Sequence, residues 1–334
     1  MREPPLHLDP AYLRTTLQAE YQLVVQELTF LPLGHDSAAW VYEARDATGT
    51  RWFVKVRTAV SNPVSLLIPR FLRDHGLPVV APIPTGAARL WADCAGYVVI
   101  VYPFIEGASA LHQGLSAAQW RHYGEILRRI HDLAPPAALQ QQLRRETFQP
   151  AGVATLRDLD AYLAAPPFAD PLVQQLAAFW HSRQGLIHTL LERAEALGRQ
   201  LAATAPTLVL CHADIHTNNV LAAPDGSLWV VDWDEVMLAP RERDLMFLIG
   251  GISAHFINPQ QESWCRAGYG DVPVDPRALA YYRYAWAVSD IGAFADQVVR
   301  HVDLGQVSRV AALNACVGLF APGEIVAIAQ SSSG

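Results

Sequence analysis

The stretch from Leu208 to Glu235 constrains the fold and chemistry of this chain more than any other. Two short apolar runs, Leu208–Leu210 and Leu228–Val231, predict strands. Each run is followed by residues that bind metals or move protons: His212, Asp214 and Asn219 after the first, and Asp232 and Asp234 after the second. Between the runs, Pro224-Asp225-Gly226 predicts a tight turn, because Pro presets φ and Gly tolerates a positive φ. We therefore expect Asp214, Asn219 and Asp232 at one end of one small sheet.

The composition is that of a folded globular protein. The chain has 334 residues, of which 51% are hydrophobic and 17% are charged. This length allows a large core and roughly two domains, and the low charge content excludes a largely disordered chain. The net charge of −7 argues against a nucleic-acid partner and favours a cationic or neutral small-molecule ligand.

Four cysteines lie far apart in the sequence, without a CxxC pair: Cys94, Cys211, Cys265 and Cys316. A disulfide framework or a structural zinc site is therefore not expected, and a reducing compartment is the natural location. The first residues lack the pattern of a signal peptide, and no apolar run is long enough to span a bilayer. We expect a cytoplasmic protein without a membrane partner.

The chain uses arginine almost exclusively as its basic residue. Among its 25 Lys and Arg residues, Lys55 is the only lysine, and it lies in the strand-like segment Arg51–Arg57. A compact ammonium differs from a planar guanidinium in size, donor geometry and hydration. A lysine retained among apolar neighbours therefore indicates a site that an arginine would not fit. The alternative is a chance lysine on a surface strand.

Residues 1–101 predict a small lobe built on a mostly antiparallel sheet. A short amphipathic helix is expected at Ala11–Ala19, and the polar tip Gly34–Ser37 and the turn Asp46–Thr50 separate strand-like segments. Asn62-Pro63 predicts a helix with Asn62 as its cap, which Pro69 should bend or break. Two more strands are expected at Val79–Pro84 and Tyr97–Val101.

The rest of the chain predicts a hinge and a larger helical lobe. Pro103 and Gly107 mark a connector at residues 102–107. Helices are expected from Ser116 to His131, from Asp170 to about Leu201 with a break or kink near Gly185, at 241–249, and at 276–302 as two helices. The expected fold class is thus α+β with two lobes: residues 1–101, the hinge 102–107, and residues 108–334.

The polar residues of the central stretch suit phosphoryl transfer. A carboxylate at Asp214 could orient an attacking hydroxyl and accept its proton, while oxygens of Asn219 and Asp232 could hold Mg²⁺ on a polyphosphate. Lys55 could neutralise phosphates. The backbone N–H groups of the Gly34–Ser37 tip could bind a phosphate group. His212, Asp214 and His216 also form H-x-D-x-H, which could bind a transition metal for hydrolysis. That alternative leaves Asn219, Asp232 and Lys55 unexplained.

The same residues carry a resemblance to a known fold. His212-Ala-Asp214-Ile-His-Thr-Asn-Asn219 followed by Val231-Asp232-Trp-Asp234 resembles the H-x-D-x-x-x-x-N and aspartate-strand set of the protein-kinase-like fold. The D-W-D sequence is similar to that of the aminoglycoside phosphotransferase family, which includes small-molecule kinases. The resemblance covers nearly the whole chain, from the Lys55 strand and the hinge to the run Pro240–Phe247.

This resemblance implies an ATP site, a Mg²⁺ site and a catalytic loop. Asp214 would be the catalytic base, Asn219 and Asp232 would bind Mg²⁺, and buried Asp244 would brace the loop. The remaining implied ATP contacts are Lys55 on the α/β-phosphates, Gly34 and Ser37 in the nucleotide loop, and the backbone of Tyr102, Phe104 and Ile105 on adenine.

The resemblance also implies an acceptor. The runs Val231–Phe247 and Gly268-Tyr-Gly270 are most similar to spectinomycin phosphotransferases. Phosphorylation of a hydroxyl on an aminocyclitol or aminoglycoside antibiotic, spectinomycin first, is therefore expected, with a role in antibiotic resistance. Asp234 and Glu235 could contact the ammonium groups of such an acceptor, or be solvated turn charges. The alternative is a kinase of the same fold that acts on a metabolic alcohol or another natural product.

One position departs from the pattern of the fold. Kinase-like folds pair the strand lysine with a glutamate on the following helix, yet no Asp or Glu occurs between Lys55 and Asp74. Either Lys55 is held by Asp232 and phosphate alone, or the pair is absent. The missing acid motivates a third hypothesis, a nucleotide-binding pseudokinase.

Overall fold

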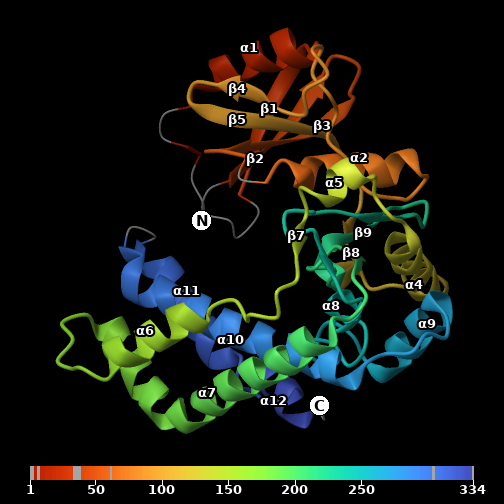
Figure 1. The fold of residues 1–334 in the computed structure, drawn as a ribbon. Helices are drawn as coiled ribbons and strands as arrows, with labels where there is room; N and C mark the ends of the chain where they lie inside the picture. Colours follow the sequence, from red (N-terminus) through yellow and green to blue (C-terminus); the bar gives the residue numbers. More distant parts are fainter. Residues whose placement is uncertain (1–3, 6–7, 33–38, 61, 303–304, 333–334) are drawn as a thin grey trace. The chain divides into compact units, whose positions relative to one another are not determined.

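The computed structural model describes residues 4–5, 8–32, 39–60, 62–302 and 305–332, drawn as coloured ribbons in Figure 1. Its contacts divide the chain into two compact units. The first unit comprises Met1–Gln119, Ala134–Leu143 and Thr217–Val236, and the second comprises Trp120–Leu133, Arg144–His216 and Met237–Gly334. The chain therefore passes from one unit to the other within the central stretch, directly after His216.

The first unit is built on a five-stranded antiparallel sheet with strand order β1-β2-β3-β5-β4. The strands are β1 (Val25–Leu31), β2 (Ala39–Asp46), β3 (Arg51–Arg57), β4 (Ala92–Cys94) and β5 (Tyr97–Pro103). Helix α1 (Pro10–Tyr21) lies across one face of this sheet (Figure 1), and helix α2 (Val64–Asp74) packs on the other.

Alternation along β3 separates the core of this unit from its functional face. Val54 and Val56 are fully buried in the cluster that includes Leu13 and Leu17 of α1. Because successive side chains of a strand point to opposite faces, Lys55 lies on the face away from α1. One face of β3 thus packs against α1, and the other face presents Lys55.

Five local expectations for this unit have clear outcomes. The first helix and the Asp46–Thr50 turn are confirmed, and the Asp46 N–H donates to the Thr50 carbonyl at 3.1 Å. Pro69 does not break α2, which runs unbroken from Val64 to Asp74. The Asn62 side chain does not cap that helix. Instead, the backbone carbonyl of Asn62 accepts the Ser65 hydroxyl at 2.7 Å. The expected strand at 79–84 is reduced to a single bridge between Val79 and Val230.

A second, three-stranded sheet in the first unit carries part of the central stretch. Its order is β10-β9-β6, and the pairs are antiparallel. The strands are β6 (Ala108–Ser109), β9 (Val220–Ala222) and β10 (Leu228–Val230), and the short helices nearby are α3 (Ala110–Gln113), α5 (Ala137–Gln140) and a 3-10 turn at Thr217–Asn219. The Pro224–Gly226 turn between β9 and β10 is confirmed, because the Asp225 carboxylate accepts the Ser227 N–H at 2.9 Å.

The second unit is mainly helical. Its helices are α4 (Ala117–Asp132), α6 (Val153–Leu163), α7 (Pro171–Thr204), α8 (Glu242–Leu245), α9 (Pro259–Tyr269), α10 (Pro276–Arg300), α11 (Gly305–Gly318) and α12 (Ile325–Ser331). Helix α10 packs against α6, α7, α11 and α12 at the centre of the unit (Figure 1). Helix α7 opens at Asp170-Pro171 as expected, and the Asp170 side chain caps it. Contrary to expectation, α7 continues through Gly185, and α10 is one helix rather than two.

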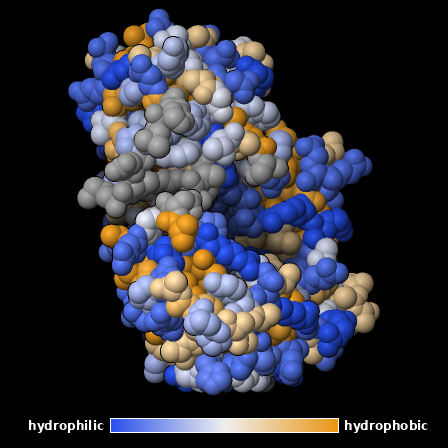
Figure 2. Space-filling view, turned by 90° about the vertical axis from the view of Figure 1, so that its left-hand side faces the viewer, coloured by the Kyte–Doolittle hydropathy of each residue, from blue (hydrophilic) through white to orange (hydrophobic). Residues whose placement is uncertain are grey.

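A small sheet completes the second unit and confirms the α+β class. Its order is β7-β11-β8, with strands β7 (Arg144–Arg145), β8 (Val209–Cys211) and β11 (Met237–Ala239). In the described part of the chain no helix is long and apolar enough to cross a membrane. The face shown in Figure 2 is largely hydrophilic, with hydrophobic residues scattered in small groups.

Candidate active site

The central stretch does not end on one sheet, so the expectation of a single sheet carrying Asp214, Asn219 and Asp232 is wrong. Asp214 follows β8, which pairs with β11 in the second unit. Asn219 and Asp232 flank β9 and β10, which pair with each other in the first unit. Apolar runs of three residues specify a strand but not its partner, because the same pattern fits either sheet.

A cavity of about 380 Å³ lies in the first unit and holds most of the candidate nucleotide residues. Its walls come from the sheet, from α2, from the segment after β5 and from the residues around β9 and β10. The candidate residues that line it are Lys55, Tyr102, Phe104, Ile105, Asn219, Asp232 and Asp234. Its volume is within the range of small-molecule sites, and the walls are mostly apolar side chains such as Val41, Val80 and Leu221.

Four charged side chains meet in this region. The Lys55 Nζ lies 2.9 Å from Oδ2 of Asp234 and 3.7 Å from Oδ1 of Asp232. An Nη of Arg57, two residues further along the same face of β3, lies 2.9 Å from the same Asp234 oxygen. Burial raises the pKa of Asp234, but the charges of Lys55 and Arg57 more than offset this, so the pKa lies below its ordinary value. Two cations and two carboxylates thus form a compact, electrically balanced cluster.

Asn219 and Asp232 supply oxygens from adjacent strands. Asn219 ends the 3-10 turn before β9, and its carbonyl accepts the Val231 N–H at 3.0 Å, which holds the two segments together. Asp232 has a left-handed backbone with φ of 62°, a conformation that costs energy for a residue other than glycine and that clusters at functional sites. Half of its side chain is exposed. An amide oxygen and a carboxylate in this arrangement fit a hard divalent cation.

The segment after β5 offers one free edge of backbone. The Phe104 N–H donates to the Arg51 carbonyl at 3.3 Å. Antiparallel pairs alternate in the side to which their polar groups point, so Tyr102 also faces β3 and the Pro103 carbonyl points away from it. The Ile105 N–H makes no hydrogen bond with the described residues. This acceptor and donor match the edge of an adenine, whereas the Phe104 N–H, expected to serve there, is already used.

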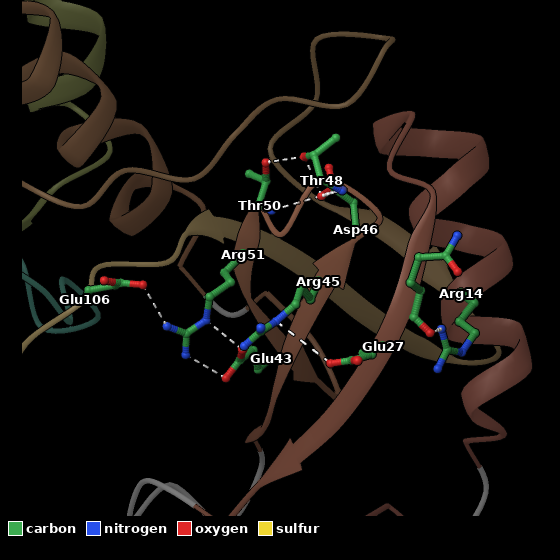
Figure 3. A network of polar contacts seen from close by, with 10 residues as sticks. Arg14, Glu27, Glu43, Arg45, Asp46, Thr48, Thr50, Arg51 and Glu106 are labelled. Atoms are coloured by element: carbon green, nitrogen blue, oxygen red, sulfur yellow. Dashed lines mark hydrogen bonds and ion pairs between the residues drawn. The ribbon is translucent and has the colours of Figure 1, made fainter.

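An ionic network holds the same segment (Figure 3). The Arg51 guanidinium binds both oxygens of Glu43 at 2.6 and 2.9 Å and reaches Glu106 at 3.2 Å. It also stacks on the ring of Phe104, 3.7 Å from the ring centre. Bidentate pairing and stacking are the strengths of arginine. Arg51 therefore ties β2 and β3 to the residues that line the cavity.

In the second unit, Asp244 braces the loop that carries Asp214. Asp244 is fully buried and accepts the N–H groups of His212 at 2.9 Å and of Ala213 at 2.7 Å. The left-handed backbone of Ala213, with φ of 68°, aims both groups at one carboxylate. Burial raises the pKa of Asp244, but hydrogen bonding and charge from His131 outweigh it, so its pKa is lowered. The expected bracing role of Asp244 is confirmed, and His212 is fully buried.

Asp214 itself is partly exposed and lies beside an aromatic group. Its carboxylate is 3.4 Å from the His216 Nε2. Burial lowers the pKa of His216 to about 4, so this ring is neutral at neutral pH. The His216 ring contacts Phe247 and Phe256, and Phe247 contacts Trp286.

The aromatic contacts around His216 lead through Trp286 to a carboxyl that sequence reasoning missed, Asp290. Trp286 donates to Asp290, whose pKa is raised to about 7 by burial. The signal for Asp290 was its position four residues after Trp286 on one face of α10.

The transition-metal alternative is not supported. Among the described residues, only one group of three or more His, Cys or acidic residues has all its possible ligand atoms within 4.8 Å of one another, namely His131, Cys211 and Asp244. All three are buried, and hydrogen bonds link His131 to Asp244 and the Cys211 thiol to the Ala239 carbonyl. His212 cannot join Asp214 and His216 as a ligand, because its Nδ1 already accepts the Asp214 N–H at 3.2 Å.

The remaining candidates have simple placements. Gly34 and Ser37 lie outside the described residues. Glu235 is exposed and lines a smaller cavity of about 80 Å³ with Arg57 and Asn62. Arg57 was missed by sequence reasoning, although the two-residue spacing from Lys55 on a strand would have placed both side chains on one face.

A family model decides the class of protein. The model of the phosphotransferase enzyme family, the APH family, matches residues 29–282. The chain belongs to this family. It is therefore a phosphotransferase, a kinase that acts on alcohol groups, and its fold is the protein-kinase-like fold of the aminoglycoside phosphotransferases.

Solved structures and a curated relative agree with this. A spectinomycin phosphotransferase in complex with ADP and spectinomycin is 31% identical, with a TM-score of 0.88 over 96% of this chain and 98% of that one. An AMP-bound complex of spectinomycin phosphotransferase is also 31% identical, with a TM-score of 0.83 over 97% and 99% of the two chains. Protein StrN of Streptomyces griseus is 26% identical over 80% of this chain and 78% of its own length.

Proposed function

We propose that this kinase transfers the γ-phosphoryl group of ATP to a hydroxyl of an aminocyclitol antibiotic, with spectinomycin as the first candidate, and so confers resistance to it. The observation that carries the proposal is the cavity of the first unit, which combines a free backbone edge with the Lys55 cluster. The likeness to a phosphotransferase solved with ADP and spectinomycin supports the acceptor. We place the reaction in the cytoplasm, where ATP and Mg²⁺ are abundant.

The spacing within the cavity suits a nucleoside triphosphate. Lys55 stands opposite Ile100 in the β3–β5 ladder, and Pro103 is three residues further along β5. At about 3.3 Å per residue this places the adenine edge roughly 10 Å from the lysine, which is the reach from an adenine to its α- and β-phosphates. The Pro103 carbonyl and the Ile105 N–H would bind the base, and Lys55 would bind those phosphates.

Asn219 and Asp232 are the residues that would hold Mg²⁺. Their amide and carboxylate oxygens are the ligands that this ion prefers in proteins. When bound, the ion would draw charge from the β- and γ-phosphate oxygens. Lys55 would add a second positive charge from β3.

Asp214 is the proposed catalytic base. Its carboxylate would orient the acceptor hydroxyl and take its proton as the oxygen bonds to phosphorus and the bond to the ADP leaving group breaks. Neutral His216 beside it cannot neutralise the carboxylate by charge.

The surroundings of Asp214 suit an acceptor that carries amines. The partly exposed rings of Phe256 and Trp286 and the Asp290 carboxyl belong to one connected group of side chains, joined through buried Phe247. Aromatic faces and a carboxylate are the usual partners of ammonium groups. The same features would serve a smaller amino alcohol, so a metabolic kinase of the same fold is the second candidate.

The decisive experiment is a substrate panel. The purified protein is incubated with ATP, Mg²⁺ and either spectinomycin, other aminocyclitols and aminoglycosides, or simple amino alcohols. ADP release and the mass of the product are then recorded. We expect ADP and singly phosphorylated spectinomycin. Turnover of an amino alcohol alone would select the metabolic kinase, and nucleotide binding without turnover of any acceptor would select the pseudokinase.

Asp214→Asn is the matched control, because it keeps the size and polarity of the side chain and removes its basicity. Turnover should fall by at least about 100-fold, the scale of general base catalysis, while binding of AMP-PNP is retained. Unchanged turnover would remove Asp214 from its proposed role.

A further inference from the structure

The first unit contains an unexpected solution for holding its single lysine. A lysine side chain has four rotatable bonds, so it needs an anchor to keep its ammonium in one place. In kinase-like folds a glutamate on the helix after the strand is that anchor. Here α2 presents only Ser65 and Pro69 to the cavity, and its one acid, Asp74, is its last residue.

Asp234 has the geometry of the missing anchor. Its Oδ2 lies 2.9 Å from the Lys55 ammonium and 2.9 Å from the Arg57 guanidinium. The side chain is itself held in place, because its neighbours Trp233 and Val236 are buried and the Val236 N–H donates to the Trp233 carbonyl at 3.2 Å. An acid on a fixed turn, gripped from a second side by Arg57, can keep Lys55 in one position.

We propose that Asp234 is the positioning residue of Lys55, in place of the absent helix acid, and that Arg57 holds Asp234 for this task. The proposal rests on the proposed function only for its kinetic consequence. It gives the second acid of the D-W-D sequence a role of its own, separate from that of Asp232, and it removes the structural motive for a pseudokinase.

Two rival roles for Asp234 make different predictions. As a contact to acceptor amines, its loss would raise the KM of the acceptor. As a metal ligand, its loss would raise the Mg²⁺ concentration needed for half-maximal activity. As a positioning residue, its loss lowers kcat and leaves both of these constants unchanged, because Lys55 then fails to meet the phosphates in the transition state.

The single lysine allows a direct test that needs no substrate. After selective ¹⁵N-lysine labelling, the chain has one Nζ resonance, which is observable when a held ion pair slows proton exchange with water. We expect this resonance in the wild type and in Asp93→Asn, which changes an exposed acid on β4 of the same unit. Asp234→Asn should broaden it beyond detection. A resonance that is the same in wild type and Asp234→Asn overturns the proposal, whatever the enzyme phosphorylates.

Kinetics supply the second arm. Asp234→Asn should lower kcat roughly 10- to 100-fold, the ratio expected for loss of a charge-assisted hydrogen bond, with an unchanged melting temperature. Arg57→Gln should lower kcat less, and should have little further effect in the Asp234→Asn background, because both act through one carboxylate. Fully additive effects, or a shift in the Mg²⁺ requirement or acceptor KM instead of kcat, would refute it. A wild type that neither binds AMP-PNP nor turns over removes the proposed function alone.

Discussion

Asp290 should make the stability of this kinase fall as pH rises from about 4 to 7. Burial raises its pKa from 3.8 to about 7, so the folded chain keeps a proton that the unfolded chain releases at lower pH. Between these two values the folded state binds more protons than the unfolded state, and unfolding becomes easier as pH rises. Below pH 4 both states are protonated and above pH 7 both are ionised, so the effect is confined to this window.

The magnitude follows from the two pKa values. The difference between 3.8 and about 7 corresponds to about 4 kcal/mol at 1.36 kcal/mol per pH unit. The side chain is partly exposed, so water recovers part of this cost and we expect about 1–3 kcal/mol. Asp290→Asn removes the charge but keeps an oxygen that can accept from Trp286. The variant should match the wild type at pH 3 and exceed it by this amount at pH 8.

The assay is thermal or urea unfolding of both proteins from pH 3 to 8.5. For a chain of this size a gain of 1 kcal/mol raises the melting temperature by roughly 2 °C, so the two curves should diverge by several degrees across the window. Asp74→Asn, at an exposed position on α2, should leave the profile parallel to the wild type. If the profiles of Asp290→Asn and the wild type are also parallel, Asp290 is not protonated in the folded state and the reasoning fails.

Two further predictions test particular contacts. Lys55→Arg should fold normally but lower kcat/KM at least about 10-fold in the ADP-release assay. The reason is that a guanidinium cannot replace a compact ammonium between two carboxylates. Wild-type kinetics would mean that the lone lysine is accidental. Gly268→Ala should cost several kcal/mol in unfolding experiments, since its Cβ would overlap the Arg121 carbonyl, whereas Gly185→Ala meets open space and should add roughly 0.5–1 kcal/mol of stability. Equal melting temperatures for the two glycine variants would contradict this.

Patterns of local origin were predictable from the sequence. The helix that opens at Asp170-Pro171 and the turn at Pro224–Gly226 follow from short motifs, and the structure confirms them. The bracing role of Asp244 was implied by the family resemblance, and it is also confirmed. Glycine and proline were weaker helix breakers than the sequence predicted, because Gly185 and Pro69 lie inside continuous helices. A helix buried along one face tolerates such residues, because tertiary packing outweighs a local propensity of about 1–3 kcal/mol.

Partners distant in sequence were not predictable. Nothing local indicates that β8 pairs with β11 and not with β9. The ion pair of Lys55 was equally unpredictable, since its partner Asp234 lies 179 residues away in the sequence. Kinase-like folds place this acid on the helix that follows the lysine, whereas here it follows β10. Alternation on β3 would have placed Arg57 beside Lys55, and a second cation there calls for a second acid.

The Lys55–Arg57 pair also explains why one lysine persists in an arginine-rich chain. Both side chains lie on one face of β3 and bind the same oxygen of Asp234, so positive charge alone cannot distinguish the two positions. What differs is the second neighbour, because Lys55 also approaches Asp232, at 3.7 Å. A planar fork can grip Asp234 from the side, but its width would press on the carboxylate proposed to bind Mg²⁺. Arginine therefore replaces lysine where one acid must be held, and lysine is retained where a small cation must fit between two.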